Sequence, residues 1–224
     1  MQVKRRKLQK FYTDYKGELR SGNIELFLQI SIDIYLEILN IKTRIDILHE
    51  KLNPKDIPDP KKFVVERVQF YDEIGFLNKK NYKLAIQGII TLSTYYEALI
   101  NEIGVVELGS KYYKENLDKL SVQAKWEIIL RLIYSKGIDK NSQEYESLNE
   151  IITLRNKLVH YKTKTLGKPS KENIQQENEN ARKIMIIFET GIVCLKKFHL
   201  NLRNIDSSKE ILKFFKFSRE LERF

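Results

Sequence analysis

Residues 80–103 read KNYKLAIQGIITLSTYYEALINEI, and apolar side chains recur along this stretch in steps of three and four. This spacing places them on one face of an α-helix, because a helix completes a turn about every 3.6 residues. The stripe consists of Tyr82, Ala85, Ile89, Leu92, Tyr96, Leu99 and Ile103. A helix with so regular a stripe is typical of the core of an antiparallel helical bundle. Gly104 follows directly and is expected to end the helix.

Two segments upstream extend the helical pattern. Residues 23–52 carry a second stripe, and the three prolines at positions 54–60 are expected to end that helix, because proline lacks an amide donor and clashes with the preceding turn. Its apolar members are Phe27, Ile30, Ile34, Ile38, Ile41, Ile45 and Leu48. Residues 61–74 are apolar and partly β-branched, which favours a helix leading into Gly75 and leaves a short strand as the alternative.

Three more helices are predicted downstream. Residues 113–136 carry apolar side chains on one side, and Gly137 is expected to end this helix. Ser142 is a candidate N-cap for a helix that continues through His160, because its hydroxyl can accept a hydrogen bond from a free amide of the first turn. Ser170 is the candidate cap of the last long helix. The stripe of that helix consists of Ile184, Phe188, Gly191, Leu195, Phe198 and Leu202.

Together these segments predict an all-α fold, an up-and-down bundle of four or five long helices with helical additions at both ends. We expect a basic N-terminal extension over residues 1–22, the bundle over residues 23–204 and an amphipathic C-terminal helix over residues 205–224. The low numbers of turn-forming residues, 9 Gly and 4 Pro in 224 residues, agree with long helices and few loops.

The composition restricts the class of protein. A formal charge of +10 suits an anionic partner such as nucleic acid, an acidic protein or a membrane surface, with a solvated lysine-rich surface as the alternative. A single cysteine, Cys194, excludes an internal disulfide and a four-cysteine zinc site. His49, His199 and Cys194 are interpreted as packing or surface residues. No apolar run could span a membrane and no signal peptide is evident, so we expect a cytoplasmic protein without metal, cofactor or membrane attachment.

Polar residues that could take part in catalysis lie near the C-terminal end of the helix that begins at Ser142. The apolar stripe of this helix consists of Leu148, Ile151, Ile152, Leu158 and Val159. Arg155 falls on that stripe, where a guanidinium needs an anion or a partner. His160 is four residues beyond Asn156, so these two lie on one face, and all three polar side chains share one arc of the helix. A salt bridge for Arg155 and a helix-dipole contact for His160 are the structural alternatives. The basic run expected to bind RNA comprises Lys157, Lys162, Lys164 and Lys168.

The string from Arg155 to His160, RNKLVH, resembles the signature of the HEPN superfamily (higher eukaryotes and prokaryotes nucleotide-binding domain). That signature is an Arg, a polar residue that is often Asn, and a His a few residues later, on a late helix of a bundle. Residues 91–102, TLSTYYEALINE, also resemble a core helix of the family. The resemblance covers residues 23–204 and implies an HEPN-like bundle.

Many HEPN proteins are metal-independent endoribonucleases whose two motifs meet across a homodimer interface. The resemblance therefore implies that His160 acts as acid or base, that Arg155 holds the scissile phosphate, and that Asn156 orients the pair. It also implies a toxin, or a phage-defence or stress effector, with an antitoxin as a further partner. Lys162 departs from HEPN toxins paired with a nucleotidyltransferase, which carry Tyr there. Because some members of the family lack nuclease activity, the alternative is a non-catalytic module that binds RNA, nucleotide or a protein.

Three smaller features complete the candidates. Glu97 and Glu102 are placed to pair with Arg155, either as a structural contact or as a group that adjusts the chemical properties of the guanidinium. The basic cluster at residues 4–7 is interpreted as a disordered end, with an RNA contact as the alternative. Residues 207–224 carry a Phe-rich face, which we expect to pack on the bundle or on a dimer mate; docking on another partner and lying at a membrane interface are the alternatives.

Overall fold

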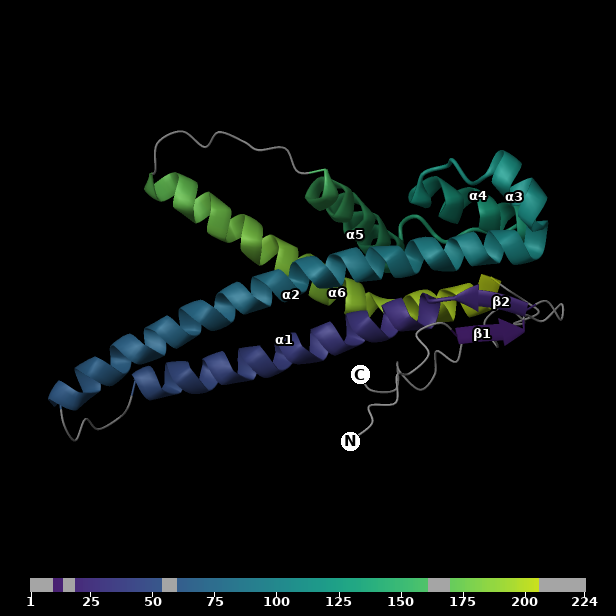
Figure 1. Ribbon diagram of the computed structural model, residues 1–224. Helices are drawn as coiled ribbons and strands as arrows, with labels where there is room; N and C mark the ends of the chain where they lie inside the picture. The colour runs from purple at the N-terminus through teal and green to yellow at the C-terminus, as the bar shows by residue number, and fades with distance from the viewer. Residues whose placement is uncertain (1–9, 14–18, 54–59, 161–169, 206–224) are drawn as a thin grey trace, which may run out of the picture.

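The computed structural model describes residues 10–13, 19–53, 60–160 and 170–205 (Figure 1). Within these ranges the chain forms six α-helices and one short β-hairpin. The helices are α1 (Ile24–Leu52), α2 (Pro60–Leu108), α3 (Ser110–Asn116), α4 (Val122–Tyr134), α5 (Gln143–Val159) and α6 (Lys171–Ile205). The all-α bundle predicted from the apolar periodicity is confirmed. No helix in the described part is long and apolar enough to cross a membrane.

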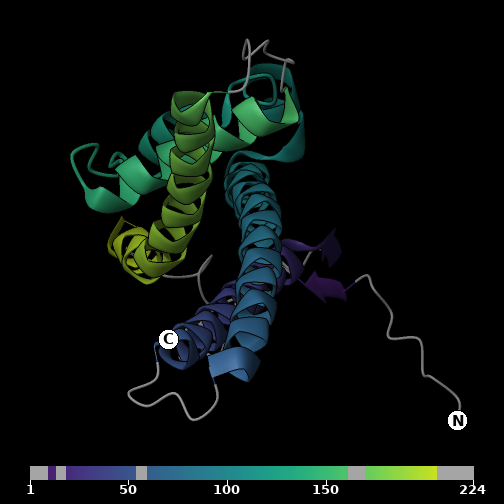
Figure 2. The same ribbon diagram turned by 90° about the vertical axis from the view of Figure 1, so that its left-hand side faces the viewer.

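The helices α1 and α2 form a long antiparallel hairpin whose outer end projects beyond α5 and α6 (Figures 1 and 2). A small apolar cluster holds this end together. Its buried members are Ile41, Leu48 and Leu52 of α1 and Ile74 and Leu77 of α2. Lys80 donates to Glu37 at 2.6 Å across the same pair of helices. The outer end is therefore stabilised mainly by contacts between α1 and α2, and at its inner edge Lys42 of α1 also pairs with Glu189 of α6 at 2.7 Å.

The main core lies where the second half of α2 meets α4, α5 and α6. Aromatic rings fill its centre and are completely buried. Phe198 of α6 packs edge-on against Trp126 of α4 at 5.0 Å and against Tyr96 of α2 at 5.1 Å between ring centroids. Such tilted contacts between buried rings are favourable beyond their area alone. This cluster fixes α6 against α2 and α4, and with it the position of α5, which packs on α6.

Helix boundaries differ from the prediction at the glycines. The two predicted helices around Gly75 are one continuous helix, α2, and Gly104 lies inside it rather than at its end. Gly104 serves close packing, because a Cβ there would lie 2.7 Å from the ring of Tyr113. Gly109, with φ +83, follows the true end of α2. Packing of the Tyr113 ring thus explains Gly104, which the local sequence pattern predicted to end a helix.

The predicted helix over residues 113–136 is two helices, α3 and α4. Ser121 separates them, and its side chain accepts a hydrogen bond from the amide of Ala124, as an N-cap does. The end of α4 is Ser135, in the left-handed conformation with φ 56, and not Gly137. Trp126 and Ile129 are completely buried, as the apolar pattern of this segment predicts. Ile128, which the same pattern places on a buried face with Leu117, Leu120 and Ala124, is 38% exposed.

The N-terminal addition is not helical where it is described. Strands β1 (Lys10–Thr13) and β2 (Leu19–Gly22) pair antiparallel, with Lys10 opposite Gly22 and Thr13 opposite Leu19. Four-residue segments cannot repay the cost of starting a helix, whereas a ladder satisfies their backbone groups across the hairpin. The expected C-terminal helix over residues 205–224 lies outside the described residues, apart from Ile205 in α6, and so does the basic cluster at residues 4–7.

Candidate functional site

The helix α5 carries the RNKLVH string at its C-terminal end. It begins as predicted at Ser142, whose side chain accepts from the amide of Tyr145, and it ends at His160, whose amide donates to the carbonyl of Asn156. Its inward face is buried against α2 and α6 through Leu148, Ile151 and Ile152. Arg155 is therefore the first residue of that face to reach the edge of the core.

Arg155 is held in place by two partners. Its Nη2 lies 3.9 Å from Glu97 Oε2 of α2, and its Nη1 donates to Asn156 Oδ1 at 3.0 Å. The side chains of Arg155 and Glu97 are 31% and 36% exposed, so the guanidinium stands at the boundary between core and solvent. Its Nε atom is buried with no acceptor among the described residues. The predicted contact with Glu97 is present, and Arg155 still has donors available for an anion.

His160 faces a different surface of α5 from Arg155. It is exposed and lines an open groove of about 1240 Å³ between α5, α6 and α2, a groove to which Arg155 does not contribute. On a helix the two residues are separated by about 140°, which is consistent with this division. The structure thus brings Arg155 and Asn156 together and leaves His160 on a neighbouring face within one chain. The single shared site that the spacing suggested is not formed by one copy alone.

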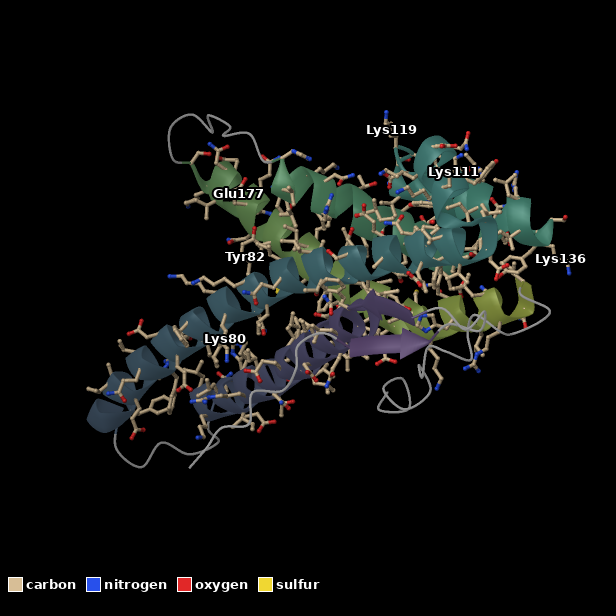
Figure 3. All side chains as sticks on the ribbon, turned by 45° about the vertical axis from the view of Figure 1, so that its right-hand side comes forward. Lys80, Tyr82, Lys111, Lys119, Lys136 and Glu177 are labelled. Carbon is tan, nitrogen blue, oxygen red and sulfur yellow. The ribbon has the colours of Figure 1, made fainter. Side chains whose placement is uncertain are left out.

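The groove is lined by residues of both signs. Lys140, Lys157 and Lys183 provide positive charge, and Glu146, Glu150 and Glu177 provide negative charge. Figure 3 shows Tyr82 of α2 and Glu177 of α6 on facing sides of it. The predicted RNA-binding residue Lys157 lies here and is exposed, whereas Lys162, Lys164 and Lys168 lie outside the described residues.

Apolar side chains also reach the groove. Leu158, predicted on the buried stripe, is only half-buried and lines the groove. Tyr82, also predicted in the core, is likewise half-buried and lines the groove. Val159, on the predicted stripe of α5, is 53% exposed. Leu158 and Tyr82 are less buried than predicted because α6 diverges from α2 towards its N-terminus (Figure 1). No signal in the sequence of α2 alone distinguishes Tyr82 from the buried members of its stripe.

A cluster of polar residues at one end of the groove was not predicted. Tyr145 donates to Glu127 Oε1 at 2.5 Å, and Lys140 donates to the other carboxylate oxygen at 2.6 Å. The hydrogen bonds from Lys140 and Tyr145 lower the pKa of Glu127, while burial and the Glu127 carboxylate raise the pKa of Tyr145. The cluster joins α4, the following loop and α5, so periodicity within one helix could not reveal it.

His199 is buried in the core, in agreement with its interpretation as a packing residue. Its Nε2 lies 2.5 Å from the hydroxyl of Tyr95 of α2. Burial, with a smaller effect from the nearby Arg203, lowers the pKa of His199 to about 3. The imidazole is therefore neutral at physiological pH and contributes to packing between α2 and α6. Cys194 is buried on the same helix.

The comparisons with known proteins do not extend this picture. No protein-family model matches the chain, and neither a curated protein nor a solved structure is significantly similar to it. In the described ranges, His, Cys, Asp and Glu side chains do not gather in groups of three or more that could hold a metal ion.

Proposed function

We propose that this chain is a metal-independent endoribonuclease of HEPN type that cleaves RNA at a site completed by a second copy. The observation that carries the proposal is the end of α5, where Arg155 stands at the solvent boundary, oriented by Asn156 and Glu97, with the exposed His160 about one turn further on. One chain keeps His160 and Arg155 on different faces of α5. A second copy would supply the missing group to each.

The chemistry assigns a role to each residue. A ribose 2′-hydroxyl attacks the adjacent phosphorus and loses its proton to one His160 imidazole, while the 5′-oxygen leaves with a proton from the imidazole of the second copy. Imidazole suits both transfers because it titrates near neutral pH. Arg155 would hold the phosphate through its fork of donors, which strengthens as charge develops on the oxygens. The products are a 2′,3′-cyclic phosphate and a 5′-hydroxyl end.

Glu97 is best described as a positioning residue. It approaches Nη2 of Arg155, whereas Nη1 is directed to Asn156. Two anchors on one guanidinium reduce its rotamer freedom, which matters because a displacement of about 1 Å at a reacting group can cost a hundredfold in rate. Loss of Glu97 is therefore expected to lower the rate of cleavage while leaving the acid–base residue in place.

A toxin, or a phage-defence or stress effector, is the biological role we propose for such an activity, with RNA as the substrate and an antitoxin as a neutralising partner. The net charge of +10 supports an anionic substrate. The exposed Lys157 lies next to the Arg155–Asn156 pair in sequence and lines the groove with His160.

The experiment is RNA cleavage by the purified chain in the presence of EDTA. We expect cyclic-phosphate products from the wild type and a loss of at least a hundredfold with His160→Ala or Arg155→Ala, the range typical of a lost acid–base or charge-stabilising group. His49→Ala is the matched control, because His49 is an exposed histidine on α1, away from the site. Full activity of His160→Ala would refute the assignment of the acid–base residue.

A non-catalytic module that binds RNA, nucleotide or a protein is the second candidate. It is favoured by Glu97, which already offsets the charge of Arg155, and by the separation of Arg155 from His160. Expression in cells separates the two functions. A nuclease should slow growth only with Arg155 and His160 intact, whereas a binding module should behave alike in the wild type and in the Arg155→Ala/His160→Ala variant.

A further inference from the structure

Two tyrosines mark the side of α2 that leads out of the groove. Tyr71 and Tyr82 are eleven residues apart, three helical turns and about 20°, so both lie on one side of α2, about 16 Å apart along its axis. Tyr82 lines the groove with His160, and Tyr71 is 53% exposed. Figure 3 shows Tyr82 on the side of α2 towards α6 and Lys80 on the side towards α1. The side of α2 that borders the groove therefore continues along the projecting hairpin.

Arg67 extends this line by one further turn and stands between two aromatic rings. The carbon at the centre of its guanidinium lies 6.0 Å from the centroid of the Tyr71 ring and 5.7 Å from that of the Phe63 ring. Its Nη2 donates to the Tyr71 hydroxyl at 3.4 Å, and the side chain stays exposed. A guanidinium held beside an exposed ring offers a flat surface for a nucleobase and a cation for its phosphate.

The charges on this part of α2 favour an anionic partner. Between residues 67 and 83, three exposed cations form no ion pair among the described residues, namely Arg67, Lys79 and Lys83. One exposed acid, Asp72, is likewise unpaired there, while Glu73 pairs with Arg44 of α1. RNA matches this arrangement, because it carries a phosphate at every nucleotide and every base has a π face. A protein helix would have to supply acids at matching positions.

We propose that this side of α2 binds single-stranded RNA and leads it into the groove. We call it the α2 track; it consists of Arg67, Tyr71 and Tyr82. Bases stack on the two tyrosine rings, and the guanidinium of Arg67 binds a phosphate. Because only bases free of a complementary strand can stack in this way, the track selects single strands over duplexes. The track is about 22 Å long, which spans about six nucleotides at 3.4 Å per stacked nucleotide.

This inference deepens the proposed function, and it rests on that function only for its link to catalysis. Tyr82, Lys157 and His160 line the same groove, so a strand on the track continues towards His160. The track holds nucleotides on one side of the bond to be cut, away from the reacting atoms. Contacts of Arg155 and Lys157 with phosphate are alike for paired and unpaired RNA, whereas the stacked rings supply selectivity for unpaired bases.

Binding of a fluorescent 2′-O-methyl oligonucleotide of about twelve nucleotides to the purified full chain tests the track, because blocked 2′-hydroxyls prevent the proposed cleavage. The wild type should bind the single strand at least about tenfold more tightly than the duplex of the same sequence. Tyr71→Ala should raise the dissociation constant of the single strand about 5- to 150-fold, the effect of losing one stacked base. Tyr112→Ala is the matched control, because Tyr112 is 46% exposed on α3, at the opposite end of α2 (Figure 1).

Two further variants separate stacking from charge. Tyr71→Trp keeps a π face and should bind the single strand as the wild type does. Arg67→Gln removes one phosphate contact and should reduce the slope of log affinity against log salt concentration by about 0.7. Equal binding by Tyr71→Ala and Tyr112→Ala, or equal affinity for single strand and duplex, would overturn the proposal. Binding to neither oligonucleotide would also overturn it and would leave this face to a protein partner.

Cleavage of unmodified RNA distinguishes this inference from the proposed function. Tyr71→Ala should raise KM and leave kcat nearly unchanged, because Tyr71 lies outside the groove and contributes binding alone. A chain that binds single strands as expected but cuts no RNA would refute the nuclease and keep the track. A nuclease whose KM is the same in the wild type and in Tyr71→Ala would refute the track and keep the nuclease.

Discussion

The contact between Gly88 and Phe188 holds α6 on α2 next to the groove, and adding one methyl group at Gly88 should weaken it. The ring of Phe188 is completely buried, and a Cβ at Gly88 would overlap its Cζ and Cε2 atoms and lie 2.7 Å from Cε1. Carbon atoms prefer separations of about 3.5–4.0 Å. The ring must therefore move, and the packed rings around α6 leave it little room.

Two opposing effects determine the magnitude for Gly88→Ala. Alanine favours the helix over glycine by about 1 kcal/mol, whereas overpacking a filled core costs about 1–3 kcal/mol. Because the overlap involves three atoms of a buried ring, we expect overpacking to prevail with a net loss of about 1–2 kcal/mol. For a chain of this size that corresponds to a melting temperature lower by about 3–6 °C.

Thermal unfolding of Gly88→Ala, Phe188→Leu and the double variant measures this contact. Phe188→Leu alone should destabilise the chain by leaving a cavity, which the alanine methyl partly fills in the double variant. The double variant should therefore be more stable than the sum of the single losses by at least about 0.5 kcal/mol. A rise in melting temperature for Gly88→Ala, as helix propensity alone predicts, would refute the close approach of the ring, and so would strict additivity.

Three further predictions concern polar contacts. The pKa of His199 lies near 3 in the folded chain, below its ordinary value of 6.5, so at this residue only the unfolded chain gains a proton as the pH falls from 6.5 towards 3. The free energy of unfolding should therefore decline over this range by at most about 1.4 kcal/mol per pH unit. Chemical denaturation between pH 4 and 6 should show a smaller decline for His199→Gln. Tyr145→Phe removes the hydrogen bond to Glu127 and should lower the free energy of unfolding by about 1 kcal/mol, seen as a lower urea midpoint with an unchanged slope; an unchanged midpoint would show that the contact is not stabilising. Glu97→Gln should cost less than about 1 kcal/mol in thermal unfolding, because its pair with Arg155 is partly exposed. It should nevertheless lower RNA cleavage more than Asp33→Asn, the same neutralisation at an exposed carboxylate of α1, and equal cleavage by the two variants would argue against a positioning role.

The fold could be predicted from the sequence because helical periodicity is a local signal. The stripe from Ala85 to Ile103 is buried throughout, and Ser142 and Ser170 cap α5 and α6 as expected, each accepting a hydrogen bond from an amide three residues later. In both cases the information lies within one or two turns of helix, where spacing and hydrogen bonding are set by the chain itself.

Local reasoning failed where a distant side chain decides the role of a residue. Gly75, Gly104 and Gly137 have the same sequence signal, yet the first two lie inside α2 and the third follows a helix that has already ended at Ser135. Tyr113 accounts for Gly104, whereas no described residue comes within 4 Å of a Cβ at Gly75. Propensity could not separate these cases, because a contact such as that of Tyr113 with Gly104 is made by a side chain from another helix.

In the candidate site, too, some features follow from the local sequence and others only from how the helices pack. By itself the sequence determined that Arg155, Asn156 and His160 share the end of one helix, since helix geometry fixes their relative angles. Only the tertiary structure decided that Arg155 meets Glu97 of α2 while His160 turns to a groove shared with α6. It also brought Glu127, Lys140 and Tyr145 together from three elements. The physical reason is that side-chain direction follows from the local helix, whereas the partner in that direction depends on how separate helices pack.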